Sequence, residues 1–120
     1  MAVRRIARLN EQLKRELSQL IRMEVRDPRV GLVTITGVDT TRDLNMARVY
    51  VRTTGSEEER ASSLEGLDAA APFLRTALGK ILSIRRVPEL RFQEDRSLDH
   101  ARRIEQVLSE VIPREEEDEA

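Results

Sequence analysis

The sequence predicts an α+β domain in which a small β-sheet is covered by helices. Three observations lead to this fold class: apolar residues recur at helical spacing near the start, two runs rich in β-branched residues follow, and helical spacing then returns. A chain of 120 residues is long enough for one domain that buries roughly two thirds of its unfolded surface. The chain has no cysteine and a single histidine, which excludes disulfides and metal sites built from thiolate or histidine clusters.

The first predicted helix runs from Val3 to about Arg26. Its apolar residues recur three and four positions apart, so they share one face. They are Ile6, Leu9, Leu13, Leu17, Leu20 and Ile21. The opposite face carries a column of arginines, namely Arg4, Arg8, Arg15, Arg22 and Arg26. Asp27-Pro28 is expected to end the helix, because a residue before proline is pushed out of the helical region.

Two strands are predicted over residues 31–38 and 46–54. In the second run Ala47, Val49 and Val51 alternate with polar residues, which indicates one buried and one polar face. The connection between the runs is short, so the two strands are expected to be antiparallel neighbours.

Two helices, a third strand and a last helix are predicted beyond the second strand. One helix begins at the N-cap Ser56 and runs to about residue 70, and a separate one has Pro72 in its first turn and continues through Ile84. A strand over residues 89–93 and a helix over residues 97–112 follow. The long crossover to the third strand predicts a mixed three-stranded sheet.

Charge is unevenly distributed along the chain. Five acidic residues lie between Glu115 and Glu119, and removing them from the formal net charge of −1 leaves +4 for the rest. Residues 113–120 are therefore expected to form an acidic disordered tail. Nearly all of the 21 basic residues are arginine, whose planar fork suits phosphate oxygens. A basic body is typical of proteins that bind polyanions, although an arginine-rich genome would explain the composition equally well.

Enzymatic activity is not expected. The chain has no cysteine nucleophile, no Gly-x-Ser-x-Gly motif and no glycine-rich phosphate loop. The lone His100 follows Asp99 in a predicted surface turn, which favours a hydrogen-bonded surface histidine. No metal or cofactor site is expected. No apolar run suits a signal peptide or a membrane span, so a cytoplasmic location is expected.

Binding of structured RNA is the function that the composition favours. Aromatic residues make up 2% of the chain and are limited to Tyr50, Phe73 and Phe92, of which the two phenylalanines are expected in the core. A protein that stacks single-stranded bases needs more aromatic side chains. Arginine contacts to the phosphates of folded RNA remain possible, because such RNA is recognised largely by shape.

The helix after Pro72 offers a second arginine face besides the column on the first helix. Four residues fall on one polar side of it: Arg75, Gly79, Ser83 and Arg86. A glycine inside a helix costs about 1 kcal/mol relative to alanine, so Gly79 is expected to have a structural or functional role. Gly79 leaves room either for an RNA backbone or for a neighbouring element of the same protein.

Two long stretches of the chain resemble the ribosome-binding factor A family, in order and spacing, from about Arg4 to Ile112. They are RDPRVGLVTITGVDTTRDLNMARVYV and FLRTALGKILSIRRVPELRFQEDRSLDHARRI. The most specific matches are Asp27-Pro28-Arg29, Asp43-Leu44, Ala47 to Val51, Arg75, Gly79, Arg85, and Pro88-Glu89-Leu90 with Phe92 and Asp95.

The resemblance implies a type II KH-like domain over residues 1–112, followed by the tail. In this family a helix-kink-helix replaces the GxxG loop with which ordinary KH domains clamp nucleic acid. The kink corresponds here to Ala70, Ala71 and Pro72, so a proline stands where the family has glycine. Proline would hold the bend by fixing φ where glycine only permits it.

The resemblance also implies a non-catalytic assembly factor without a cofactor. Such a protein would bind the immature small (30S) ribosomal subunit and its 16S rRNA near the decoding region and the 5′-terminal helix. It would aid late rRNA processing and maturation, including in the cold, act as a monomer and be released by a GTPase. The residues expected to contact RNA are Arg29, Arg75, Lys80, Arg85 and Arg86, with Arg4, Arg8, Arg15 and Arg22 as a secondary set.

A protein-binding module is the alternative from another class. The exposed edge of a three-stranded sheet could take up a partner strand, and the first helix could dock in a groove. Salt distinguishes the two functions, because arginine–phosphate contacts weaken steeply with salt and apolar docking does not.

Overall fold

The computed structural model describes residues 2–97 of the chain, with side chains from Arg4 onward. The predicted last helix beyond Ser97, His100 and the acidic tail lie outside the described residues.

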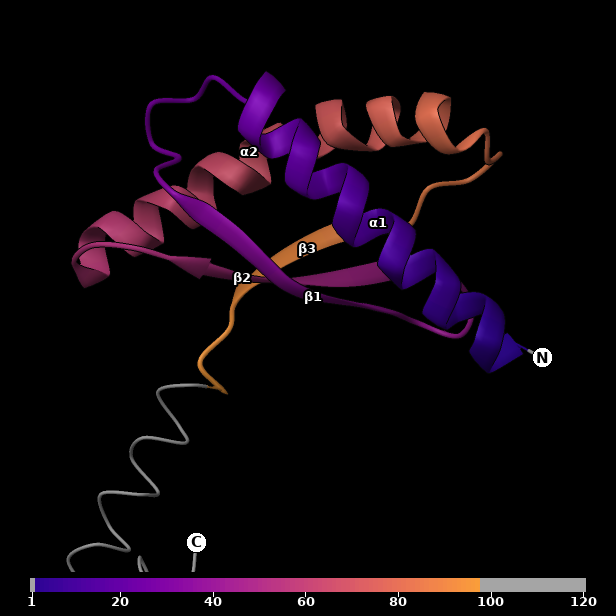
Figure 1. Cartoon of the computed structure of the whole chain (residues 1–120). Coiled ribbons are helices and arrows are strands. Elements are labelled where there is room, and N and C mark those ends of the chain that lie inside the picture. Colours follow the sequence, from indigo (N-terminus) through magenta and orange to yellow (C-terminus); the bar gives the residue numbers. More distant parts are fainter. Residues whose placement is uncertain (1, 98–120) are drawn as a thin grey trace, which may run out of the picture.

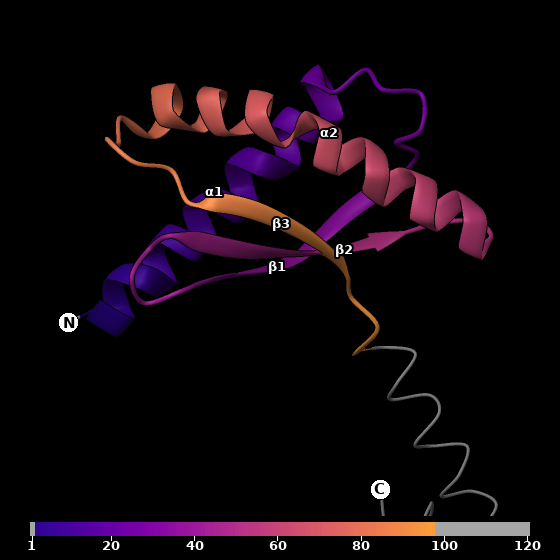
Figure 2. The ribbon, with the colours of Figure 1, turned by 180° about the vertical axis from the view of Figure 1, so that it is seen from behind.

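Two helices and a three-stranded sheet make up the described part of the chain. The elements in order are α1 (Ala2–Glu24), β1 (Val33–Thr40), β2 (Met46–Thr53), α2 (Glu57–Leu82) and β3 (Glu89–Glu94). The sheet order is β1-β2-β3, with β1 antiparallel and β3 parallel to β2, so the predicted mixed sheet is confirmed. Figure 1 shows α1 crossing in front of the strands, and Figure 2 shows the strands from the other side.

One face of the sheet is buried beneath the helices. On β2 the side chains of Ala47, Val49 and Val51 are fully buried, whereas Arg48 and Arg52 are exposed, as the alternation predicts. A single core joins this face to both helices; its helical members are Leu13, Leu17, Ile21, Leu67, Leu74 and Leu78. Both helices therefore lie on the same side of the sheet, and the arginines of β2 point to the other side.

The chain between residues 57 and 82 forms one helix, so the prediction of a separate helix that starts at Pro72 is wrong. The predicted N-cap is confirmed, because Ser56 and Glu59 form a reciprocal capping box. Pro72 lies inside the helix, where it has no N–H for the carbonyl of Asp68. Figures 1 and 2 show the helix change direction near its middle, so the predicted kink occurs within a continuous helix.

Phe73 is not a core residue, in contrast to the prediction. Its side chain is 50% exposed, because the neighbouring Leu74 occupies the inward position of this turn and is fully buried. The prediction for Phe92 is confirmed, since it packs against the core from β3.

The loop between α1 and β1 packs onto α2. The hydroxyl of Ser63 donates to the carbonyl of Arg29 at 3.2 Å and accepts from the backbone N–H of Gly31 at 3.4 Å. A Cβ at Gly66 would lie 2.7 Å from Cγ2 of Val30, so only glycine allows this approach. Because residues 31 and 32 belong to this loop, β1 begins two residues later than predicted.

Candidate nucleic-acid interface

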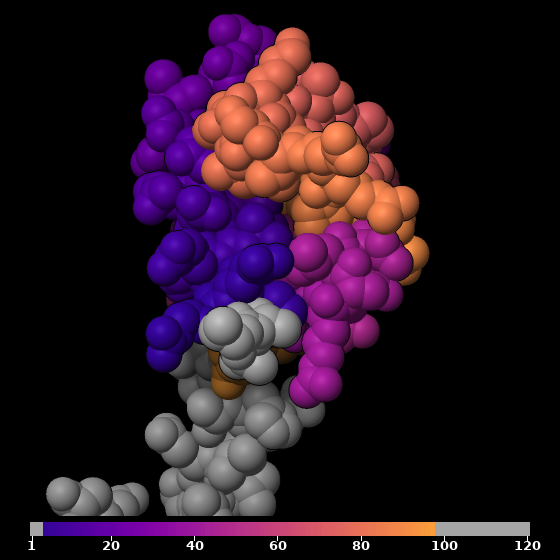
Figure 3. All heavy atoms as spheres, turned by 90° about the vertical axis from the view of Figure 1, so that its right-hand side faces the viewer, coloured from indigo at the N-terminus to yellow at the C-terminus, as the bar shows by residue number. Residues whose placement is uncertain are grey.

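All nine residues predicted to contact RNA are exposed. They do not gather on one surface, however. Arg4, Arg8, Arg15 and Arg22 lie along α1, opposite its buried leucines. Arg29 lies in the loop that packs onto α2. The remaining four, Arg75, Lys80, Arg85 and Arg86, lie in the second half of α2 and in the segment that follows it. Figure 3 shows that the end of α2 and this segment, in orange, adjoin α1, in indigo to purple.

The guanidinium of Arg29 is engaged by carboxylates of the same chain. Its Nη2 lies 2.7 Å from Oδ2 of Asp27, its Nε donates to both oxygens of that carboxylate, and its Nη1 lies 3.8 Å from Oε2 of Glu65. Hydrogen bonds from Arg29 lower the pKa of Asp27 to about 2, so the carboxylate stays ionised at neutral pH. The structure therefore gives Arg29 a role in closing the loop, and an RNA contact through its exposed Nη1 stays a prediction.

Arg75 and Gly79 both contact the segment after α2. Nη2 of Arg75 donates to the carbonyl of Val87 at 2.8 Å, and a Cβ at Gly79 would lie 3.5 Å from Cγ2 of the same residue. Val87 therefore lies beside Gly79, but at an ordinary contact distance, so this neighbour does not by itself require a glycine.

Arg86 does not share a helical face with Arg75, in contrast to the prediction. The helix ends at Leu82, and Ser83 takes the left-handed conformation at φ 52°, which redirects the chain. Arg85 and Arg86 are therefore exposed residues of the segment that leads to β3.

A further set of arginines lies on the open side of the sheet, and it was not among the predicted RNA contacts. Arg48 of β2 lies opposite Arg91 of β3 in the parallel register, and Arg52 lies on the same side of β2. Arg91 pairs with Glu89 at 3.5 Å, whereas Arg48 forms no ion pair with any described residue. On its other side Arg48 lies opposite the exposed Asp39 of β1, so the open side of the sheet carries carboxylates among its arginines. The alternation in β2 pointed to Arg48 and Arg52, but only the register places Arg91 beside them.

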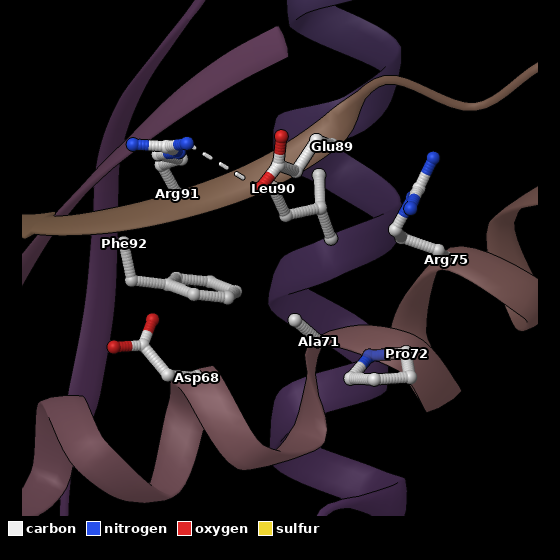
Figure 4. A pocket seen from close by; sticks show the side chains of 8 residues that line it. All are labelled: Asp68, Ala71, Pro72, Arg75, Glu89, Leu90, Arg91 and Phe92. Atoms are coloured by element: carbon white, nitrogen blue, oxygen red, sulfur yellow. Dashed lines mark ion pairs between the residues drawn. The ribbon is translucent and has the colours of Figure 1, made fainter.

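A groove between α2 and β3 connects this set with Arg75. It has a volume of about 510 Å³ and is lined by Asp68, Ala71, Pro72, Arg75, Glu89, Leu90, Arg91 and Phe92. Figure 4 shows the ring of Phe92 and the side chain of Leu90 facing the bend of α2, with the arginines on either side of Leu90. Partial burial raises the pKa of Asp68 above its usual value. Two basic and two acidic residues line the groove, so it is not a phosphate site by itself.

The part of the chain that the structure describes has neither a metal-binding cluster nor a membrane-spanning helix. Residues 2–97 hold no group of three or more His, Asp or Glu side chains that could bind a metal ion. Neither α1 nor α2 combines the length and the apolar composition that crossing a membrane requires.

Comparison with known proteins identifies a family. The model of the ribosome-binding factor A family matches residues 5–108. The ribosome-binding factor A of Brevibacillus brevis is 45% identical over 107 residues, which cover 89% of this chain and 88% of that protein.

Solved structures agree with this match. The crystal structure of ribosome-binding factor A from Thermus thermophilus is similar with a TM-score of 0.69 and 35% identity, over 77% of this chain and 97% of that chain. A homology model of the Thermus thermophilus factor, fitted into a cryo-EM map of its complex with the 30S subunit, gives a TM-score of 0.61 and 34% identity over 72% of this chain and 91% of that chain. The KH-like fold implied by the sequence resemblance is thereby confirmed.

Proposed function

This chain belongs to the ribosome-binding factor A family, and we propose on that premise that it is an assembly factor that binds the small ribosomal subunit through rRNA. A homology model of a family member, similar over 72% of this chain, was fitted into a cryo-EM map of that member's complex with the 30S subunit. The role proposed is non-catalytic, because binding one RNA arrangement better than another is enough to shift a population of immature subunits.

The arginine pair on the open side of the sheet is the observation that carries the RNA-binding part of the proposal. Arg48 and Arg91 lie at opposing positions, and Arg48, whose neighbour on β1 is Asp39, forms no ion pair with any described residue. The guanidinium of Arg48 is exposed and makes no ion pair with a described residue, so its N–H donors are open to an RNA phosphate. The exposed arginines of α1 and of the segment after α2 extend this positive character to other faces of the molecule.

The finer parts of the proposal follow what the family resemblance implies. We infer that the protein acts in the cytoplasm as a monomer and contacts the 16S rRNA near the decoding region and the 5′-terminal helix. It aids late rRNA processing and maturation, including in the cold, and a GTPase releases it when the subunit is mature. The main RNA contacts in this proposal are Arg29, Arg75, Lys80, Arg85 and Arg86, with Arg4, Arg8, Arg15 and Arg22 as further contacts.

The acidic tail has a separate proposed role. Residues 115–119 carry five negative charges, which would compete with nonspecific RNA for the arginine surfaces. Deletion of residues 115–120 is expected to tighten binding to an unrelated RNA duplex in a filter-binding assay. Unchanged binding of that duplex would contradict this role.

Co-sedimentation tests the proposed function directly. The purified protein is centrifuged with free small subunits and with full ribosomes, each at low and at high salt. We expect the protein to sediment with free small subunits at low salt, to dissociate as salt rises, and to sediment much less with full ribosomes. Equal binding to both particles, or binding to neither, would contradict the proposal and favour the protein-binding module.

A further inference from the structure

A hollow with a different chemistry lies between α1 and the last turn of α2. Five residues of α1 line it together with Ile81 of α2, and its volume is about 290 Å³. The residues of α1 are Glu16, Gln19, Leu20, Met23 and Glu24. Their spacing of three and four positions places them on one face of the helix.

Two large apolar side chains from different helices are exposed at this hollow. Met23 is 63% exposed and Ile81 is 47% exposed, whereas Leu17 and Ile21 on the adjacent face of α1 are buried in the core. Exposed apolar residues that gather at one place mark an interaction site more often than isolated ones do. Methionine adapts its shape to different partners, which makes it common at such sites. The hollow is at the small end of the range for ligand pockets, and its exposed apolar side chains suit an anchoring side chain of a protein partner.

The rim of the hollow is acidic, in contrast to the arginine surfaces. Glu16 and Glu24 line it, and among the described residues no lysine or arginine does. Nε of Arg15 approaches Glu16 at 3.6 Å, but that arginine side chain is largely exposed. Glu24 forms no ion pair with any described residue. Phosphate groups would be repelled here, whereas lysine and arginine side chains would be attracted.

We propose that this hollow docks a basic protein segment of the small subunit. An apolar side chain of that segment lies between Met23 and Ile81, and its lysine or arginine side chains face Glu16 and Glu24. The inference rests on the proposed function, because it places the protein on a ribosomal particle. It adds a second kind of contact, to protein, on a molecule whose other charged surfaces face RNA.

Reversing one charge at the hollow tests this proposal, because the partner determines whether binding becomes stronger or weaker. Glu24→Lys adds positive charge, which strengthens binding to a particle made mostly of RNA unless the residue faces a basic partner. The substitution is compatible with the fold, because Glu24 is exposed and ends α1, where the helix dipole favours a cation. We expect Glu24→Lys to weaken binding to free small subunits by about two- to tenfold, as reversing an exposed ion pair would. The matched control is Glu11→Lys, which makes the same change on the arginine side of α1 and is expected to strengthen binding.

Photo-crosslinking identifies the chemistry of the partner. With p-benzoylphenylalanine in place of Met23, irradiation of the complex with free small subunits should give an adduct that protease digests and ribonuclease does not. An adduct to RNA, or no adduct from a complex that has formed, would overturn the proposal, as would a Glu24→Lys variant that binds as tightly as the wild-type protein. If the wild-type protein does not bind free small subunits at all, the proposed function itself fails, which the co-sedimentation experiment detects independently.

Discussion

Arg48 of β2 lies directly opposite Arg91 of β3 on the open side of the sheet. The two residues come from segments more than forty positions apart, joined by the whole of α2. Both side chains are exposed, and only Arg91 has a carboxylate partner among the described residues, Glu89 at 3.5 Å. Arg48 also lies opposite Asp39 of β1 but forms no ion pair with it, so its guanidinium is open to a phosphate, and we infer an RNA contact here.

Arg48→Gln tests this contact. Because Arg48 faces Arg91 on one neighbouring strand and Asp39 on the other, the free energy of unfolding is expected to change by less than about 0.5 kcal/mol, measured by urea unfolding. The same change should weaken binding to free small subunits and lower the slope of log K against log salt by nearly one unit, because one phosphate contact is lost. Arg42→Gln, at an exposed arginine in the turn between β1 and β2, is the control for the loss of a positive charge. Equal effects of the two substitutions on the salt slope would show that net charge, rather than the pair, determines binding.

Much of the fold could be predicted from the sequence because its patterns are local. The leucine spacing of α1, the alternation in β2 and the capping box at Ser56 each specify an element without reference to distant residues. The prediction failed at Pro72, where local propensity favours a new helix. In the structure the flanking residues Leu67 and Leu74 are both buried in one core, and this packing keeps the helix continuous through the proline.

The candidate site could be predicted only in part because its geometry depends on distant contacts. The sequence indicates that arginines are exposed, but it does not show which of them already have partners. The guanidinium of Arg29 is bonded to the carboxylate of Asp27, two positions away, and Arg75 donates to a carbonyl twelve positions away. The pairing of Arg48 with Arg91 follows from the strand register, which no local pattern specifies.

Arg75 is expected to contribute to both stability and binding. Its hydrogen bond to the carbonyl of Val87 ties the segment after α2 to the helix. Arg75→Gln should therefore lower the free energy of unfolding by about 0.5–1.5 kcal/mol and also reduce the salt slope of subunit binding. Arg86→Gln is the matched control, because Arg86 is exposed in the same segment and should affect the salt slope alone. If both variants keep the affinity and the salt slope of the wild-type protein, this surface does not bind RNA.

The two helical glycines of α2 should respond in opposite ways to alanine. A Cβ at Gly66 would lie 2.7 Å from Val30 and 3.3 Å from Arg29, so Gly66→Ala forces the loop away from the helix. Overpacking of this kind costs about 1–3 kcal/mol and exceeds the gain in helix propensity. At Gly79 the added Cβ would meet Val87 at an ordinary 3.5 Å, so Gly79→Ala should stabilise the protein by up to about 1 kcal/mol.

Subunit binding by the Gly79→Ala variant distinguishes the two explanations for that glycine. If its function is only to admit Val87, the variant should bind free small subunits as the wild-type protein does. Weaker binding by a variant of equal or greater stability would instead show that an RNA backbone approaches Gly79.

The hydrogen bond between Thr36 and Asp95 predicts a pH dependence of stability. The hydroxyl of Thr36 on β1 donates to Oδ2 of Asp95 at 2.6 Å and so connects the end of β3 to β1 across β2. This bond and one from the backbone N–H of Ser97 lower the pKa of Asp95 from 3.8 to about 2. A carboxyl whose pKa is depressed in the folded state adds stability above its unfolded pKa and loses it as pH falls through the folded value.

Thr36→Val should therefore destabilise the protein at pH 6 and have a progressively smaller effect as pH falls from about 4 to about 2, where Asp95 becomes protonated in both states. Urea midpoints measured across this range give the comparison, and Thr34→Val, on the same strand but without a carboxylate partner among the described residues, is the control. Asp27 and Asp43 also have lowered pKa values, so the stability of every variant falls to some extent in acid. The quantity to compare is therefore the difference in stability between Thr36→Val and the wild-type protein at each pH. A difference that stays constant from pH 6 to pH 2 would show that Thr36 stabilises the sheet through packing, and that its bond to the Asp95 carboxylate contributes nothing.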